Sequence, residues 1–254
     1  MAERRQCTGP VAVRRALDAG EPLRLLLVRE GELSAATQAL VDRCREAGIP
    51  IRTAGPREIL RMARLEEPAP AGEPTEPELL ALTGPDPAAG LDVVMAAGGA
   101  LWLLSGVAYP GNAGFAIRTA EVSGADGVLL DCPFDRSGRR QALRTAMRAD
   151  RYLPVHWLEA GDAVAKARQT GRRIVAIEDS GRRAPWDADL AGPVLFVIGG
   201  EAGGIDAGLL ERCDETLRIP MRGFIPSYNL QAAMAMVAGE RLRQLQMSAG
   251  PAED

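Results

Sequence analysis

The chain has 254 residues, with 30 Lys and Arg, 34 Asp and Glu, and one His, so its formal net charge is −4 at neutral pH. A hydrophobic fraction of 46% and a charged fraction of 25% are ordinary for a globular protein. No apolar run is long enough to cross a bilayer, and the N-terminus lacks the apolar core of a signal peptide. We therefore expect a cytoplasmic protein with no membrane partner.

The first 66 residues alternate helical and strand patterns. The expected order is helix 11–20, strand 23–30, helix 34–48, strand 49–54 and helix 56–65. Ser34 can cap the second helix and Gly48 can end it, while Pro56 suits the first turn of the third. These patterns predict a small α/β domain.

Composition changes over residues 67–90, where Pro, Gly and Glu are frequent. Such a stretch indicates a linker or a long loop with at most one helical turn. We therefore expect a domain at residues 1–66, a linker at 67–90, a second domain at 91–248 and a short tail at 249–254.

The second domain is predicted to contain a parallel sheet covered by helices. Its short, almost wholly apolar strands are expected at 101–107, 127–131, 173–179 and 193–200, with helices between them at 113–124 and 160–171. Strands with this composition are typical of a sheet that is buried on both faces. The fold class predicted is α/β.

Nucleophilic and metal-ligating residues are few. The four cysteines, at positions 7, 44, 132 and 213, form no CxxC pair, which predicts reduced, packed thiols. The one histidine, His156, would have to support a Ser-His-Asp triad or a multi-histidine metal site alone. We expect His156 to be structural, at a strand end, and expect no metal.

Ligands of open parallel sheets bind at the carboxyl ends of the strands. Three segments carry unusual polar content at such ends: residues 109–124 with Asn112 and Arg118, residues 198–205 with Glu201 among four glycines, and residues 219–237 with Ser227 and Asn229. Each segment alone also fits a structural role, as a tight turn, a glycine-rich loop or a helix cap. A cap needs only one of Ser227 and Asn229.

In combination and in this order, the three segments resemble the signature motifs of SPOUT methyltransferases of the SpoU/TrmH type, over roughly residues 100–246. The resemblance implies a parallel α/β domain whose C-terminal part forms a deep trefoil knot, an exception to the rule that chains are unknotted. It implies a homodimer that binds S-adenosylmethionine among the knotted loops. The implied activity is methyl transfer to a ribose 2′-hydroxyl of structured RNA, ribosomal or transfer RNA.

The resemblance also implies site residues. The functional positions are Asn112, Arg118, Glu201, Ser227 and Asn229, and the expected cofactor contacts are Ile198, Gly199, Gly200, Ile219, Met221 and Leu230. Arg118 is expected to meet the target phosphate or hydroxyl, and Glu201 to orient Arg118 and Asn112. As a general base, Arg118 would have to lose a proton, which costs a guanidinium about 7 kcal/mol at neutral pH. As an electrostatic stabiliser of the developing oxyanion, it would keep its proton and avoid that cost. Both roles stay open.

The chain departs from the family pattern in three places. Gly200 stands where a polar residue is usual, and residues 131–155 replace the usual segment after the first motif. That segment overlaps a basic stretch: residues 136–183 contain twelve Arg and Lys and five Asp and Glu. Three of these arginines, Arg144, Arg148 and Arg151, could contact phosphates. Tyr228 either stacks on a base or packs beneath its loop.

Two other functions are compatible with these departures. One is a methyltransferase of this fold that acts on a base, a protein or a small molecule. The other is a catalytically silent RNA-binding factor, although all five polar positions are retained. The N-terminal domain resembles, more loosely, a ribosomal-protein-like domain that grips RNA.

Overall fold

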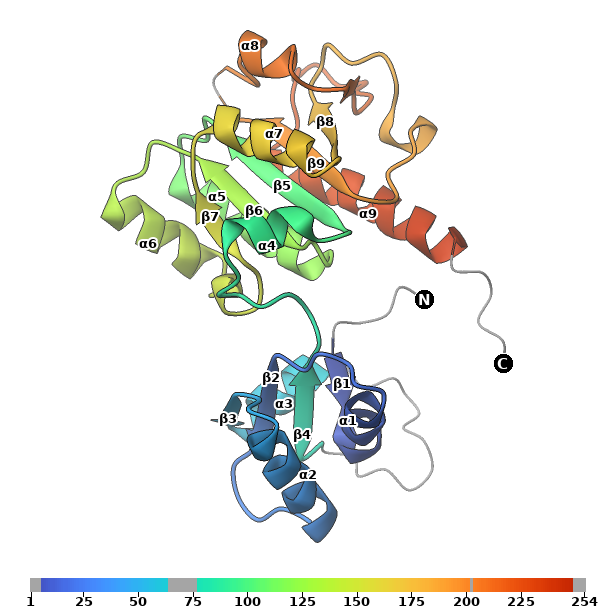
Figure 1. Cartoon of the computed structure of the whole chain (residues 1–254). Helices are drawn as coiled ribbons and strands as arrows, with labels where there is room; N and C mark the ends of the chain where they lie inside the picture. The colour runs from blue at the N-terminus through green and yellow to red at the C-terminus, as the bar shows by residue number, and fades with distance from the viewer. Residues whose placement is uncertain (1–5, 64–76, 202, 249–254) are drawn as a thin grey trace. The chain divides into compact units, whose positions relative to one another are not determined.

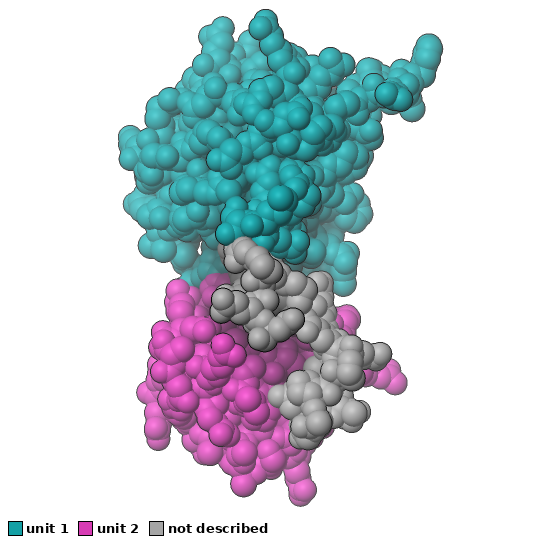
Figure 2. All heavy atoms as spheres, turned by 90° about the vertical axis from the view of Figure 1, so that its right-hand side faces the viewer, with its two compact units in different colours: residues 1–2, 85–254 teal, residues 3–84 magenta. Residues whose placement is uncertain are grey.

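The computed structural model describes residues 6–63, 77–201 and 203–248 (Figure 1). The chain divides into two compact units, one of residues 3–84 and one of residues 85–254 with residues 1–2 (Figure 2). Within the described residues, no helix combines the length and the apolar character that a bilayer crossing requires.

Over residues 6–63 and 77–84, the first unit is a four-stranded mixed sheet with three helices. In chain order its elements are β1 (Gln6–Thr8), α1 (Gly9–Asp18), β2 (Leu25–Arg29), α2 (Ala35–Glu46), β3 (Ile51–Ala54), α3 (Pro56–Ala63) and β4 (Leu79–Leu82). The strand order is β1-β4-β2-β3, and β4 runs antiparallel to both of its neighbours. The predicted helices and strands are thus present, together with β1 and β4, which the sequence analysis did not predict.

The predicted linker is wrong over its second half. Leu79, Leu80 and Ala81 are fully buried in β4, at the centre of the first sheet, and the two units divide between residues 84 and 85. Residues 64–76 lie outside the described chain, as does the expected tail at 249–254. A four-residue apolar run is too short to show a strand period, so composition alone dominated the prediction.

Ser34 caps α2 as predicted. Its Oγ accepts the N–H of Thr37 at 3.3 Å and donates to the carboxylate of Glu78 at 2.7 Å. Hydrogen bonds from the hydroxyls of Thr37 and Ser34 hold the pKa of Glu78 below its usual range. Because Glu78 directly precedes β4, this cluster ties the start of α2 to the last strand of the unit.

The second unit contains a six-stranded parallel sheet. Its elements are α4 (Leu91–Ala96), β5 (Ala100–Ser105), α5 (Pro110–Val122), β6 (Gly127–Asp131), α6 (Arg136–Thr145), the 3-10 turn η1 (Ala149–Arg151), β7 (Val155–Trp157), α7 (Ala160–Gln169), β8 (Arg173–Ile177), η2 (Pro185–Asp187), β9 (Val194–Gly199), α8 (Ala207–Leu210), β10 (Glu215–Leu217) and α9 (Leu230–Ser248). The strand order is β10-β8-β9-β5-β6-β7, with every pair parallel. The predicted parallel α/β domain is confirmed.

Helices cover both faces of this sheet, which explains the apolar strands. Trp102 and Phe196 stack with ring centroids 4.7 Å apart on the face that α5, α6 and α9 cover. Leu101 and Leu103, which flank Trp102 along β5, pack with α4 and α7 on the other face. His156 lies in the middle of β7 rather than at a strand end.

Candidate active site

The three polar segments follow the carboxyl ends of three strands, β5, β9 and β10. Ser105 at the end of β5 pairs with Gly199 at the end of β9, so the first two polar loops leave the same edge side by side. The third loop, residues 218–229, connects β10 to α9. This is the edge at which parallel α/β sheets bind their ligands.

Glu201 joins the first loop to the second. One carboxylate oxygen accepts the backbone N–H of Ala108 at 3.1 Å, and the other accepts a hydrogen bond from the side-chain amide of Asn112. Glu201 thereby fixes the position of the Asn112 amide at the start of α5. The predicted pairing of Glu201 with Asn112 is present in the structure.

The loop after β9 needs glycine for steric reasons. A Cβ atom on Gly199 would overlap the backbone of Gly204, and one on Gly200 would overlap the carbonyl of Gly106. Gly204 adopts a φ of +62°, and its N–H donates to the carbonyl of Gly200 at 3.1 Å. The backbone itself therefore forms the wall of the site here, and the departure at Gly200 keeps the β5 and β9 loops in close contact.

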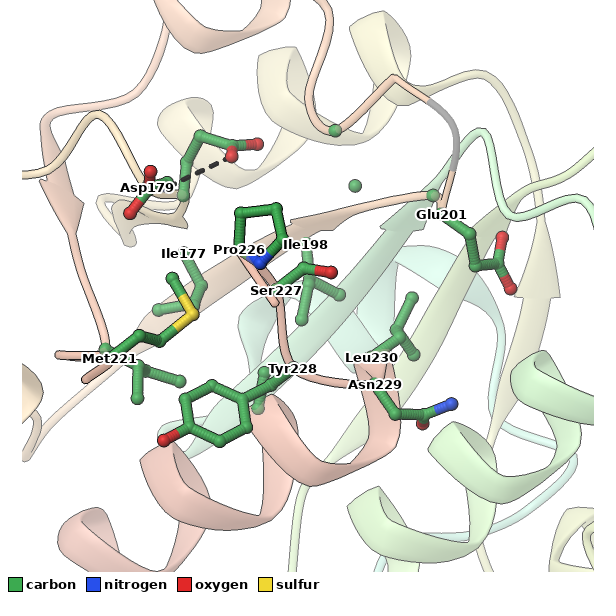
Figure 3. A pocket seen from close by; sticks show the side chains of 16 residues that line it. Ile177, Asp179, Ile198, Glu201, Met221, Pro226, Ser227, Tyr228, Asn229 and Leu230 are labelled. Atoms are coloured by element: carbon green, nitrogen blue, oxygen red, sulfur yellow. Dashed lines mark hydrogen bonds between the residues drawn. The ribbon is translucent and has the colours of Figure 1, made fainter. Parts of the chain in front are cut away.

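A cavity of about 340 Å³ lies among these loops, β8 and α9. It is lined by Ile177, Glu178, Asp179, Ile198, Gly199, Gly200, Glu201, Gly204, Ile219, Met221, Pro226, Ser227, Tyr228, Asn229, Leu230 and Ala233. All six predicted cofactor contacts line it, as do three of the five predicted catalytic residues, Glu201, Ser227 and Asn229. Glu201 and Asn229 lie on one side of the pocket, and Met221 and Asp179 on the opposite side (Figure 3).

The third loop presents unused hydrogen-bonding groups to this cavity. Asn229 caps α9, because its Oδ1 accepts the N–H of Gln231 at 3.0 Å. Within the described residues, the Asn229 amide nitrogen and the Ser227 hydroxyl have no hydrogen-bond partner. Tyr228 lines the cavity with 43% of its surface exposed, so it is not packed beneath its loop.

Arg118 lies on an exposed face of α5, outside the cavity lining. Among the described residues it makes no hydrogen bond or ion pair, and Glu201 contacts Asn112 but not Arg118. The expectation that Glu201 orients both residues therefore holds for Asn112 alone. The guanidinium of Arg118 is free to meet a ligand.

Comparison of the sequence with models of known protein families shows to which family the chain belongs. Residues 100–239, more than half of the chain, match the model of the SpoU rRNA methylase family. The chain belongs to this family. The matched span runs from the first residue of β5 into α9, so it contains all three polar loops of this SpoU protein.

Named relatives of the SpoU protein include RNA methyltransferases. Over 158 residues it is 32% identical to the 23S rRNA (guanosine-2'-O-)-methyltransferase RlmB of Xylella fastidiosa, a match that covers 60% of this chain and 63% of the relative. An uncharacterized tRNA/rRNA methyltransferase of Mycobacterium ulcerans is 29% identical over 230 residues, covering 90% of this chain and 73% of that protein. The match to RlmB thus spans less than two thirds of that relative.

Solved structures of the family resemble the SpoU protein over nearly its whole length. The AviRb methyltransferase of Streptomyces viridochromogenes, in complex with AdoMet, matches with a TM-score of 0.55 and 25% identity. The match covers 95% of this chain and 90% of AviRb. The likeness therefore includes the first unit as well as the parallel sheet.

The charge of the cavity indicates what kind of ligand fits the SpoU protein. Three carboxylates line it, from Glu178, Asp179 and Glu201, while the described lining includes no arginine or lysine. Glu178 accepts the N–H of Ile205 at 2.9 Å, and Asp179 forms an ion pair with Arg218 at 2.9 Å. An acidic, apolar-walled cavity of this size suits a small ligand that carries positive charge.

The acids of β8 were missed in the sequence analysis. Glu178 and Asp179 end the predicted strand 173–179, so a signal was present. Their place in the site depends on β8 lying beside β9, and the sequence analysis assigned no strand neighbours. No group of three or more His, Cys, Asp or Glu within the described residues could hold a metal ion.

Proposed function

We propose that this protein transfers a methyl group from S-adenosylmethionine to a ribose 2′-hydroxyl of structured RNA, ribosomal or transfer RNA. The single observation that carries the proposal is the meeting of three motif loops at one acid-lined cavity, with Glu201 hydrogen-bonded to Asn112 and the Ser227 and Asn229 side chains at the rim. The names of RlmB and of AdoMet-bound AviRb support the same chemistry.

The cavity residues fit the cofactor. The backbone of Ile198, Gly199 and Gly200 and the side chains of Ile219, Met221 and Leu230 would hold its nucleoside by shape and main-chain hydrogen bonds. The carboxylates of Glu178 and Asp179 would attract its positive charge. When bound, S-adenosylmethionine supplies a methyl group made electrophilic by the sulfonium.

The protein's own residues would align the acceptor hydroxyl and stabilise the negative charge that develops on its oxygen. In-line transfer requires a fixed hydroxyl, and the free donors of Asn229 and Ser227 can hold that oxygen at the cavity rim. Glu201 keeps the Asn112 amide in one orientation. Arg118, exposed and without a protein partner among the described residues, would stabilise negative charge on the oxygen or bind the adjacent phosphate.

A homodimer is part of the proposal. Large apolar side chains are exposed in the loop before α9 and on α9 itself: Phe224 at 105%, Ile225 at 76%, Met236 at 40% and Met247 at 70%. A second copy of the chain would bury such residues in a two-fold interface. Light scattering at micromolar concentration should give twice the mass of one chain, and a monomer would contradict this part.

The first unit is proposed to bind RNA, and the protein to act in the cytoplasm. Among the described residues, Arg14, Arg15 and Arg24 are exposed and have no acidic partner. Unpaired arginines of this kind are suited to phosphate contacts.

Two measurements test the proposed function. Calorimetry should detect S-adenosylmethionine binding, and sequencing-based mapping in a deletion strain should show one ribose methylation lost. Absence of cofactor binding would favour a silent RNA-binding factor. Cofactor binding with every ribose site retained would favour a non-ribose acceptor.

A further inference from the structure

An arginine-rich surface follows β6, on α6 and η1. We propose that this surface binds the phosphate backbone of the RNA next to the methylated nucleotide, an inference that rests on the proposed function. The residues that define the arginine face are Arg136, Arg139, Arg140, Arg144, Arg148 and Arg151. Residues 136–151 contain six arginines and one acid, Asp150, although the whole chain has a net charge of −4.

Helix α6 and the turn that follows it present these side chains to the outside. Ala142 and Ala146 are buried against the core, while all six arginines are exposed. Arg136, Arg140 and Arg144 recur every four residues, so they project from one side of the helix at intervals of about 6 Å. Such a row can contact several phosphates of one strand.

Most of this charge is not neutralised by the protein. Within the described residues, only Arg148 of the arginine face forms an ion pair, with Asp150 at 3.2 Å. Arg139 lies over the ring of Trp157, 4.6 Å from its centroid, which orients the guanidinium without cancelling its charge. By contrast, Arg168 and Arg183 pair with acids at 3.2 and 2.7 Å.

The arginine face adjoins the helix that carries two of the motif residues. A Cβ atom on Gly114 of α5 would overlap the carbonyl of Ala142 and lie 2.6 Å from the Thr145 side chain, so the two helices touch at this glycine. Figure 1 shows α6 beside α5. Asn112 and Arg118 belong to α5, so an RNA strand bound to the arginines of α6 would lie next to the proposed active site.

The turn after α6 extends the surface. Met147 and Arg148 adopt φ values of 53° and 61°, a left-handed conformation that non-glycine residues rarely adopt. This turn redirects the chain into η1, which adds Arg151 to the arginines of α6. Arginine is well suited to bind phosphate because its planar guanidinium donates two hydrogen bonds to two oxygens at once.

The test compares two triple variants with equal charge change. R136Q/R140Q/R144Q removes the row on α6, and R168Q/R182Q/R212Q removes three arginines elsewhere on the same unit as a control. The dissociation constant of a fluorescent RNA hairpin of mixed sequence is measured between 50 and 300 mM salt. Each lost phosphate contact lowers the slope of log affinity against log salt by about 0.9, so the α6 variant should lose about 2 to 3 in slope, and the control less than 1.

A lysine version, R136K/R140K/R144K, retains the charge and should keep most of the slope. Equal slopes for the α6 variant and the control, with both folded by circular dichroism, would overturn the proposal. S-adenosylmethionine binding by calorimetry separates this result from a failure of the proposed function: the α6 variant should bind the cofactor like wild type. A wild type that binds cofactor but not the hairpin would overturn the arginine face as an RNA surface as well.

Discussion

At position 229, one amide side chain serves both the helix and the proposed chemistry. Its oxygen caps α9 through Gln231, and its nitrogen has no hydrogen-bond partner among the described residues, in a side chain that lines the cavity. The two roles use different atoms, so substitution can separate them.

Serine at position 229 keeps a cap acceptor but removes the amide donors. We predict that Asn229→Ala lowers the free energy of unfolding by about 1 kcal/mol and that Asn229→Ser leaves it nearly unchanged. Both variants should lose methyl transfer by at least tenfold. Denaturant unfolding and a transfer assay with labelled cofactor give the two readouts. Activity that follows stability, lost in Asn229→Ala and kept in Asn229→Ser, would reduce Asn229 to a cap.

Two cysteines are expected to be unreactive at physiological pH. Burial raises the pKa of Cys132 to about 12 and that of Cys213 to about 11. Because an unfolded cysteine titrates near 8.5, the folded protein retains these protons where the unfolded chain loses them. Stability from this source is complete below about pH 8.5 and is lost as pH rises towards the folded values.

We therefore predict that unfolding free energy declines with pH above about 8.5, and that C132A/C213A declines less steeply than wild type. Iodoacetamide at pH 8 should leave Cys132 unmodified in the native protein. Rapid alkylation of Cys132 with the fold intact would contradict its burial as the cause.

At the residue level, the resemblance of the motifs was sufficient to predict one contact between two different loops. The motif pattern indicated that Asn112 and Glu201 meet, and they do. Arg118 was expected beside Glu201, but the helix turns its side chain outward, and nothing in a one-dimensional pattern shows which side of α5 faces the cavity.

At the level of elements, the loop after β9 depends on close backbone contact. A Cβ atom on Gly200 would overlap Gly106, whereas one on Gly203 would meet nothing within 4 Å. These two glycines of one loop form a matched pair.

We predict that Gly200→Ala weakens S-adenosylmethionine binding at least tenfold and costs roughly 1–3 kcal/mol of stability, because the β5 and β9 loops must move apart. Gly203→Ala should alter both quantities little. For both variants, calorimetry measures cofactor binding and denaturant unfolding measures stability. Equal effects from the two substitutions would contradict the steric argument.

Arg172 anchors the connection between α4 and β5. Its buried guanidinium donates to the carbonyls of Met95 at 2.8 Å and Gly99 at 2.6 Å, and to that of Ala97. Burial lowers the pKa of Arg172, so these hydrogen bonds offset the cost of removing the charge from water.

Arg172→Met should cost about 3–5 kcal/mol, because several carbonyls lose their donor while staying buried. The exposed pair of Arg168 with Asp214 provides the control: Arg168→Met should cost less than about 1 kcal/mol. Urea unfolding compares the two. A loss for Arg172→Met no larger than the control would show that water replaces the guanidinium.

Long periodic helices and apolar strands were predicted, whereas short or composition-biased elements were not. β4 has four residues after a Pro-rich stretch, and α6 carries so many arginines that its one buried residue, Ala142, gives little hydrophobic period. Both elements form because packing against the rest of the protein stabilises them, although the local sequence pattern alone does not.

At the level of the whole molecule, the cavity depends on strand order. β8 and β9 are neighbours, and β9 also pairs with β5, so loops about 100 residues apart in the chain reach one place. Sequence reasoning identified the parallel sheet and two units, but neither the neighbour order nor the boundary at residue 84. The trefoil knot implied by the resemblance stays a prediction.

The most direct measurement is mass spectrometry of nucleosides from RNA that the purified protein has treated with deuterium-labelled S-adenosylmethionine. We predict label on a single ribose 2′-oxygen, and its loss in Asn229→Ser. Label on a base, or no label on any RNA from the native host while the cofactor binds, would contradict the account.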